Sequence, residues 1–375
     1  MKSFELPASS LFETFNCRYY ELRHEAYDEA VLAQVLKKDR SGLDDVVYLK
    51  NDYEINRSIA AEGSLKAYDM VLTPSGFVVI KEFFSGIPLS QFILHREFSV
   101  PLFLQIAMRL TRLLRELHVQ KILVKEFVIE DILVVPETLE MKICSLGSAT
   151  RVLRERPEYS PEFSYYGPLW HIAPEQTGRV GRTVDHRTDF YGLGVILYQV
   201  LCWRKPFNYT DSLELIHAHI AKRPLEPRQV REHIPQIISD IVMKLMAKNS
   251  EDRYQGADGI LSDLEQCMRQ WQQTGTVSPF VLGSQDFSSQ FSFSEKLYGR
   301  DEALGVLLGA WERIDRKGAG LLLVAGYSGI GKTRLVSEIK KPVLEANAYF
   351  ITGKFDQYAR EYPYSAFVQA FAMFT

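Results

Sequence analysis

The chain has 375 residues, of which 46% are hydrophobic, so it can bury a substantial core and is long enough for two domains. Its formal net charge of -3 gives no electrostatic reason to expect nucleic acid or an anionic membrane as a partner. No apolar run approaches the roughly 20 residues that span a bilayer, and Glu5 and Glu13 lie where a signal peptide would be apolar, which indicates a cytosolic protein.

The N-terminal part favours a small, strand-rich lobe with one helix. Short β-branched segments at 30–36 and 76–83 flank a polar, helix-like stretch at 44–62. From Pro101 onward, apolar residues recur at helical spacing. The segments with this spacing are 101–118, 188–201, 213–221, 236–247 and 256–273. A second, mainly helical lobe is therefore predicted.

The composition changes again after the last of these helices. Residues 274–295 are rich in Ser, Gly, Thr and Phe and lack sustained periodicity, which is typical of a linker. An amphipathic helix is predicted at 296–314, followed by an apolar strand at 320–325, a glycine-rich turn and a helix at 334–346. This second domain is of a different class from the first.

The cysteines favour neither a metal site nor a disulfide. Cys17, Cys144, Cys202 and Cys267 are scattered singly, with no Cys-x-x-Cys pair and no histidine nearby at metal-ligand spacing. We expect them to be reduced and mostly buried as small hydrophobic side chains.

The run at 169–207 resembles the carboxyl lobe of a protein kinase. Glu175 belongs to an Ala-Pro-Glu motif, and Asp189, followed by two glycines, matches the helix that anchors that lobe. Arg253 lies where kinases place the arginine that pairs with the glutamate of the motif. A buried carboxylate is tolerated only beside a fixed guanidinium, so these residues argue for the fold and say nothing of catalysis. The resemblance covers about residues 15–270.

The same resemblance locates the positions that carry kinase chemistry. Kinases use a glycine-rich loop over the phosphates, a lysine paired with a helix glutamate, a catalytic aspartate and two metal ligands. The first glycine here is Gly42, so the first hairpin has none that would let its backbone approach a triphosphate. The other positions hold Gln34 for the lysine, Asp52 for the helix glutamate, Glu126 for the catalytic aspartate, Asp131 for the asparagine and Ser145 for the aspartate of the Asp-Phe-Gly turn.

These substitutions fall together on the positions that handle charge. Gln34 cannot neutralise phosphate oxygens, and Ser145 offers a neutral hydroxyl where Mg²⁺ prefers a carboxylate. Asp52 is a shorter acid with no cation to hold. Glu126 and Asp131 keep oxygen ligands, which leaves a displaced metal site open. The resemblance therefore implies a pseudokinase.

A phosphate-binding loop stands in the second domain. The segment GYSGIGKT fits the pattern GxxxxGK[ST] completely, between a predicted strand and a predicted helix. Its glycines, Gly326, Gly329 and Gly331, let backbone N–H groups wrap the phosphates. Lys332 reaches the β- and γ-phosphates, and the Thr333 hydroxyl can hold Mg²⁺, so ATP and Mg²⁺ are the expected cofactors.

The hydrolytic half of the second domain is not recognisable. Asp356 follows the next apolar run, earlier than a Walker B acid usually falls, and is interpreted as a loop residue. No Walker B acid, sensor or arginine finger is evident before Thr375. We therefore expect binding of ATP with little turnover, and a truncated module.

Together, the segments APEQTGR, YGR, GYSGIGKT and GKFDQ resemble the front end of large bacterial sensor proteins. In that family a serine/threonine kinase-like domain precedes an AAA or STAND-type P-loop ATPase module, as at the front of hybrid histidine kinases. The resemblance implies an α+β, two-lobed kinase-like fold at 10–272, a linker at 273–296 and the start of an α/β P-loop NTPase domain at 297–375.

The leading hypothesis is a cytoplasmic signalling protein in which a catalytically impaired kinase-like domain, regulatory or scaffolding, is coupled to an ATP-binding P-loop module. Its expected partners are ATP and proteins or downstream signalling domains, with neither nucleic acid nor membrane. One alternative is an active serine/threonine kinase with Glu126 as base and Asp131 as metal ligand. Another is a P-loop ATPase with an inert kinase-like scaffold. Gln34 and Ser145 argue against the first, and the missing Walker B acid argues against the second.

Overall fold

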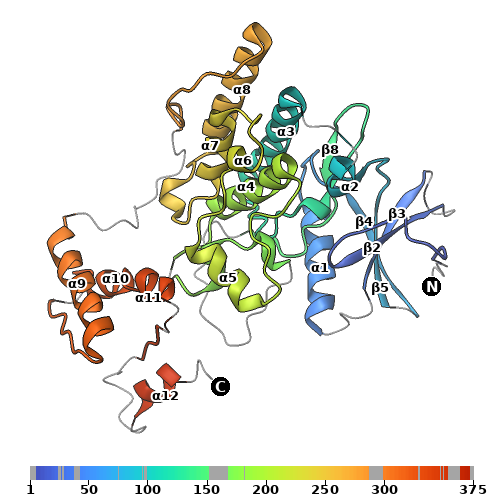
Figure 1. The fold of residues 1–375 in the computed structure, drawn as a ribbon. Helices are drawn as coiled ribbons and strands as arrows, with labels where there is room; N and C mark the ends of the chain where they lie inside the picture. The colour runs from blue at the N-terminus through green and yellow to red at the C-terminus, as the bar shows by residue number, and fades with distance from the viewer. Residues whose placement is uncertain are drawn as a thin grey trace.

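The computed structural model shows a strand-rich lobe, a helical lobe and a further group of helices toward the C-terminus (Figure 1). It describes residues 6–23, 27, 29–37, 43–74, 76–94, 96, 99–151, 168–180, 182–286, 299–327, 330–346, 348, 350–353 and 364–371. Among these residues, no helix is long and apolar enough to cross a membrane.

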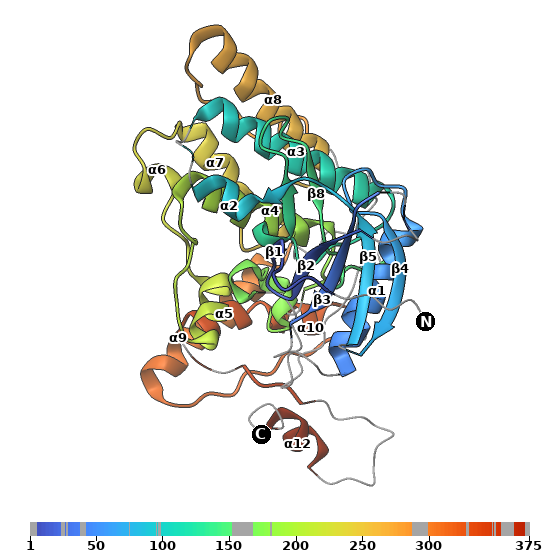
Figure 2. The ribbon, with the colours of Figure 1, turned by 90° about the vertical axis from the view of Figure 1, so that its right-hand side faces the viewer.

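The described part of the first lobe is an antiparallel sheet with the strand order β1-β2-β3-β5-β4. Its strands are β1 (Phe12–Glu13), β2 (Cys17–Leu22), β3 (Val31–Leu36), β4 (Ala67–Thr73) and β5 (Gly76–Glu82). Helix α1 (Leu43–Ser58) connects β3 to β4 and packs against β4 and β5 (Figure 2). The strands expected at 30–36 and 76–83 and the helix between them are confirmed. Strand β4 was not predicted; it is an edge strand with few buried residues, so its apolar signal is weak.

A small sheet joins the two lobes. It consists of β6 (Ile87–Pro88), β7 (Ile132–Val134) and β8 (Met141–Ile143), in that order. Helix α2 (Leu89–Leu94) follows β6 directly. The chain after α1 is tied to β8, because the Leu65 N–H donates to the Ile143 carbonyl and the Ile143 N–H donates to that of Gly63. The turn after β8 is therefore held close to the end of α1.

All the helices expected in the second lobe are confirmed. They are α3 (Val100–Val119), α4 (His186–Cys202), α5 (Ser212–Ala221), α7 (Gln236–Leu245) and α8 (Ala257–Thr274), with a short α6 (Pro227–Val230) between α5 and α7. Helix α3 begins where the Ser99 hydroxyl accepts the Leu102 N–H, with Pro101 in its first turn. Helix α4 is buried along its whole length because it is apolar on nearly every face.

Short 3₁₀ turns connect these helices. They are η1 (Ile129–Asp131), η2 (Leu169–His171), η3 (Pro174–Thr177) and η4 (Ser250–Asp252). Two of them carry residues on which the kinase resemblance rests, since Glu175 lies in η3 and Arg253 directly follows η4.

The first half of the predicted linker is packed against the helical lobe. Phe280 and Leu282 lie against the main core, and the Asp286 carboxylate accepts the backbone N–H groups of Gln255 at 2.8 Å and Gly256 at 3.0 Å. This part of the segment is an extension of the lobe. Residues 287–298 are outside the described residues.

The C-terminal region departs from the expected pattern. Helix α9 (Asp301–Lys317) is confirmed, but described residues 319–327 form no strand, and Leu321 and Leu323 are 99% and 86% exposed. The expectation of a strand at 320–325 is wrong for this structure, because an apolar strand is stable only when its backbone is paired and one face is covered.

The helix expected at 334–346 is also divided. It forms α10 (Lys332–Ser337) and α11 (Lys340–Glu345), and a further helix, α12 (Ser365–Phe371), lies near the end of the chain. Pro342 has no N–H to donate to the carbonyl of Glu338, and its ring crowds that carbonyl. The single expected helix is therefore interrupted at residues 338–339, about one turn before the proline.

Candidate functional site

The five kinase-pattern positions lie where the two lobes meet. Gln34 is on β3, Asp52 on α1, Glu126 on the loop after α3, Asp131 at the end of η1, and Ser145 two residues after the end of β8. Their side chains are nearly closed to solvent. The exposed fractions are 0% for Gln34 and Asp52, 4% for Ser145, 6% for Asp131 and 8% for Glu126.

Asp52 has a cation, and the expectation that it holds none is wrong. The Lys81 ammonium forms an ion pair with the Asp52 carboxylate, and both side chains are fully buried. Lys81 also donates to the Cys144 carbonyl at 2.6 Å. The sequence reasoning missed Lys81 because kinases carry this lysine on the third strand of the lobe. A lone cation at the end of the apolar run GFVVIKE was the available signal.

The strand register explains how a lysine on β5 reaches Asp52. In the antiparallel pair β3·β5, Leu32 lies opposite Lys81 and Gln34 lies opposite Val79. Side chains two residues apart on a strand share a face, so Gln34 and Lys81 point to the same side of the sheet. Gln34 itself donates to the Cys17 sulfur at 3.5 Å.

Asp52 also holds the turn that replaces Asp-Phe-Gly. One of its carboxylate oxygens accepts the Leu146 N–H, and the Ser145 hydroxyl lies 3.3 Å from the same oxygen. The Tyr48 hydroxyl lies 2.8 Å from the Ser145 hydroxyl. Ser145 is therefore engaged by two side chains of α1 at the position where a kinase holds its metal.

Asn51 and Tyr48 extend these contacts along the turn. The Asn51 amide donates to the carbonyls of Gly147 at 2.7 Å and Ala149 at 2.8 Å. A Cβ atom on Gly147 would lie 2.3 Å from the ring of Tyr48, so this position requires glycine. Helix α1 and the turn at 145–149 are thus joined by three side chains of the helix.

The sheet of the first lobe also contacts Cys144, the residue that precedes this turn. Tyr19 on β2 is fully buried, stacks on Phe12 with ring centroids 4.6 Å apart, and donates its hydroxyl to the Cys144 carbonyl at 3.1 Å. That carbonyl therefore accepts from both β2 and β5. Large side chains and their hydrogen bonds occupy this part of the space between the lobes.

Glu126, Glu130 and Asp131 follow α3 closely in the chain, and the two glutamates are near enough to affect the pKa of Asp131. Burial raises the pKa of Asp131 well above its ordinary value, and the nearby Glu130 and Glu126 raise it further. Burial also raises the pKa of Glu130. Among the described residues, no group of three or more His, Cys, Asp or Glu side chains is arranged to hold a metal ion.

Glu175 and Arg253 form a buried, bidentate ion pair. The two guanidinium nitrogens lie 2.6 Å and 2.8 Å from the two carboxylate oxygens, and the Thr188 hydroxyl donates to the carboxylate at 2.7 Å. Burial alone would raise the pKa of Glu175, but Arg253 holds it below its ordinary value. The pair connects η3 to the end of η4 through the core of the helical lobe.

Asp189 positions the loop that carries Glu126. Its carboxylate accepts the N–H groups of Val124 at 3.0 Å and Lys125 at 2.8 Å, and His118 Nε2 lies 2.7 Å from it. Lys125 has a φ of 64°, a left-handed conformation that is unusual for a side chain of this kind. The loop is therefore held in a strained shape by one buried carboxylate at the start of α4.

The phosphate loop precedes α10. Lys332 donates to the carbonyls of Gly326 and Tyr327, both at 2.8 Å, and Gly331 has a φ of 94° that favours glycine. Thr333 lies in the first turn of the helix with an exposed side chain. Gly329 and Asp356 lie outside the described residues.

Beside this loop is a pocket of about 400 Å³. Its lining includes Arg300, which precedes α9, and Leu307 on that helix. Leu323 and Lys332 line it as well. Lys332, the lysine of the phosphate loop, therefore lines an open, partly apolar pocket of the size that small ligands occupy.

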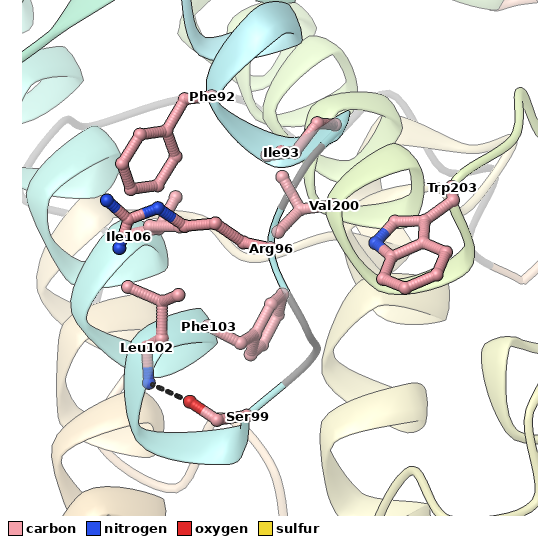
Figure 3. Close-up of a pocket in the computed structure, with 9 residues that line it drawn as sticks. All are labelled: Phe92, Ile93, Arg96, Ser99, Leu102, Phe103, Ile106, Val200 and Trp203. Carbon is pink, nitrogen blue, oxygen red and sulfur yellow. Dashed lines mark hydrogen bonds between the residues drawn. The ribbon is translucent and has the colours of Figure 1, made fainter. Parts of the chain in front are cut away.

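A second hollow lies in the helical lobe and contains none of the expected site residues (Figure 3). Its volume is about 20 Å³, enough for a single water molecule. Arg96 extends across it with its guanidinium 4.2 Å from the centre of the Phe92 ring, and Trp203 lies at the opposite side. It is a packing gap between α2, α3 and the end of α4.

Comparisons with known proteins agree with this architecture. Residues 17–268 match the protein kinase domain, and residues 296–374 match an AAA ATPase domain. Domains of both kinds generally bind ATP with Mg²⁺.

Three relatives illustrate the range of similar proteins. The chain is 35% identical over 221 residues to hybrid signal transduction histidine kinase G of Dictyostelium discoideum, covering 54% of this chain and 6% of the relative. It is 24% identical over 249 residues to the probable serine/threonine-protein kinase CPE1738 of Clostridium perfringens, covering 66% and 36%. It is 30% identical over 132 residues to the serine/threonine-protein kinase PknB of Mycobacterium leprae, covering 35% and 21%.

The chain thus spans between 6% and 36% of the length of these relatives. The bacterial origin and the hybrid histidine kinase context expected from the sequence stay predictions. The two-lobed α+β fold, with an ATPase domain after it, is shown by the architecture and by the domain matches together. The chain belongs to the protein kinase domain family.

Proposed function

We propose that the kinase domain of this signalling protein does not transfer phosphoryl groups and serves as a regulatory or scaffold module beside an ATP-binding P-loop module. One observation carries the proposal: all five charge-handling positions hold atypical residues, and each is at most 8% exposed. A kinase must bring ATP and Mg²⁺ against these positions, which requires that they be open to the cleft.

The contacts of the individual side chains support the proposal. The Ser145 hydroxyl is bound to α1, so it is not directed at a metal. The Lys81 ammonium pairs with Asp52, as a kinase lysine pairs with its helix glutamate, but it also donates to the Cys144 carbonyl and has no exposed surface through which phosphate could reach it. The Ser145 hydroxyl and the Lys81 ammonium stand where a kinase stabilises the charge of a transferring phosphoryl group, and both are engaged within the protein.

The main rival is an active serine/threonine kinase, since two relatives carry that name. In that case Glu126 would act as base and Asp131 as metal ligand. The contacts of Ser145, which stands at the other metal position of kinases, argue against this role, because its hydroxyl is bound to Tyr48 and Asp52.

Radiolabel transfer tests the proposal. The full chain carrying Lys332→Ala, which removes the lysine of the phosphate loop, is incubated with γ-labelled ATP, Mg²⁺ or Mn²⁺ and a generic protein substrate. We expect the same background label as in a matched Lys332→Ala/Glu126→Ala chain. Reproducible labelling in the first protein that disappears in the second would establish an active kinase and overturn the proposal.

The P-loop module is proposed to bind ATP through the backbone of 326–331, Lys332 and Thr333. The support is the complete GxxxxGK[ST] pattern and the pocket beside it. Domains that switch with nucleotide commonly change shape when phosphate contacts form or break. The kinase domain would then supply a constant surface beside a module that responds to nucleotide.

A further inference from the structure

A lysine that the kinase pattern does not include lies at the centre of the contacts between the lobes. We propose that Lys81 replaces the lysine missing at Gln34, and that it forms part of a latch that fixes α1 against the turn at 145–149 without nucleotide. The latch consists of the side chains of Lys81, Tyr48, Asn51 and Asp52 with that turn. The proposal rests on the contacts within the kinase fold and holds whether or not the domain transfers phosphoryl groups.

The geometry of the sheet lets a lysine on β5 take the place of one on β3. Gln34 and Lys81 lie on one face of neighbouring strands, at diagonal positions of the β3·β5 ladder. A lysine at either position can therefore extend toward α1, which packs against β5. Moving the cation by one strand preserves the ion pair while removing it from the strand where kinases use it for phosphate.

One face of α1 carries all the helix side chains of the latch. Tyr48, Asn51 and Asp52 are spaced as i, i+3 and i+4, so they lie together on one side of the helix. All three contact the turn at 145–149, through the Ser145 hydroxyl, the Leu146 N–H and the carbonyls of Gly147 and Ala149. A single helix face is thus hydrogen-bonded to successive residues of one turn.

The ion pair of the latch is completely buried. Lys81 and Asp52 have no exposed surface, and separating two such charges leaves each without water or a partner. The ion pair therefore opposes any outward motion of α1. In kinases the corresponding lysine–glutamate pair forms only when the helix is correctly placed, which makes it a point of control. Here the pair and the turn contacts fix the helix from within the domain.

A phosphate-binding role for Lys81 is the competing interpretation. It requires that nucleotide reach the ammonium, yet Lys81 is covered completely, and Tyr19 shares its acceptor, the Cys144 carbonyl. Nucleotide would have to displace both donors and separate the buried ion pair. The geometry therefore favours the latch.

Hydrogen exchange on the full chain tests the latch. Asn51→Ala removes two hydrogen bonds to the turn, and Lys81→Met removes the charge of the pair. We expect faster exchange of the Leu146 amide and of α1 in both variants, by about tenfold or more for Lys81→Met, which equals about 1.4 kcal/mol in the opening equilibrium. The matched control is Lys66→Met, which alters an exposed lysine beside β4. Unchanged exchange in both latch variants would overturn the proposal.

A charge transplant tests the replacement of one lysine by the other. Gln34→Lys alone adds a second buried cation beside one carboxylate and should lower the unfolding midpoint. Combined with Lys81→Met, it should raise the midpoint above that of Lys81→Met alone, because the new lysine reaches Asp52. If Lys81→Met gives no folded protein, recovery of folded protein by the transplant supports the proposal. A transplant no better than Lys81→Met contradicts it.

The two proposals fail in different ways. Phosphoryl transfer by the Lys332→Ala chain would overturn the absence of kinase activity and leave the exchange data untouched. Hydrogen exchange that is unchanged in Lys81→Met and Asn51→Ala would overturn the latch without bearing on kinase activity. A third result, in which Lys332→Ala chains bind Mg²⁺-ATP and lose this binding with Lys81→Met, would make Lys81 a nucleotide ligand and overturn the latch.

Discussion

Two lysines of this chain are candidates for contact with nucleotide phosphates, Lys81 as the substitute for the lysine missing at Gln34 and Lys332 in the phosphate loop, and their surroundings differ. Lys81, between the lobes of the kinase domain, is fully buried and bound to a carboxylate and a carbonyl. Lys332, in the phosphate loop, is partly exposed and bound to two carbonyls of its own loop beside an open pocket. We therefore expect that the exposure of the lysine, more than its presence, decides which of the two sites binds a nucleotide.

The largest expected effect is on stability, and it separates the two lysines. Lys81→Ala leaves the Asp52 carboxylate buried without a cation, so we expect a loss of about 3–5 kcal/mol of unfolding free energy. Lys332→Ala removes only partly exposed hydrogen bonds, so its effect should stay within about 0.5 kcal/mol. Denaturant melts of both variants measure the two losses. Equal losses would remove the basis of the comparison.

The pair Glu175–Arg253 provides a reference for a buried ion pair elsewhere in the domain. Glu175→Ala and Arg253→Ala should each lower the unfolding free energy by about 3 kcal/mol or more, because each leaves its partner charge buried. The double variant should lose much less than the sum of the two. Additive losses in denaturant melts would show that the two residues do not interact in solution.

Two glycines sharpen the contrast between a packed turn and a nucleotide loop. Gly147→Ala drives a methyl group into the Tyr48 ring, so we expect a loss of about 1–3 kcal/mol in thermal or denaturant unfolding. Gly331→Ala meets no neighbouring atom but must adopt a φ of 94°, so it should strain the loop by about 1–2 kcal/mol and weaken ATP binding. Weaker ATP binding by Gly147→Ala alone would reverse the assignment of the two turns.

The smallest expected effect is a dependence on pH. The folded-state pKa of Glu175 is lowered, so its contribution to stability is present above the ordinary value of 4.5 and is lost as the pH falls through the folded-state value. Glu175→Gln should therefore show a shallower loss of stability on acidification than the parent chain. If the parent chain and Glu175→Gln lost stability in parallel from neutral to acid pH, the Glu175–Arg253 pair would not be the cause of the pH dependence.

The regular pattern of the sequence was sufficient for most of the fold. Strands β3 and β5 follow from short β-branched segments, helix α1 from the polar, helix-like stretch between them, and the helices of the second lobe from apolar spacing. The buried pair in the helical lobe follows from the Ala-Pro-Glu resemblance. Lys81 was missed because its role depends on the register of β3 against β5, which no local pattern specifies. Aligning the sequence to kinase positions shows that the lysine is missing at Gln34, but it does not show that Lys81 on β5 takes its place.

The C-terminal region shows a different limit of sequence reasoning. The motif around Lys332 is strong, yet the expected strand before it does not form in the described residues, and Leu321 and Leu323 are exposed. Apolar composition predicts the tendency to pair, whereas pairing needs a neighbouring strand. The candidate nucleotide loop could be predicted from its motif, whereas the strand predicted before it is not formed by the described residues.

The most direct test is the stoichiometry of nucleotide binding. Calorimetric titration of the full chain with ATP and Mg²⁺ counts its sites, and Lys332→Ala shows which of them belongs to the phosphate loop. We expect one site per chain in the parent protein and no measurable binding by Lys332→Ala. Two sites, or a site that survives in Lys332→Ala, would show that the cleft of the kinase domain accepts nucleotide and would contradict the account.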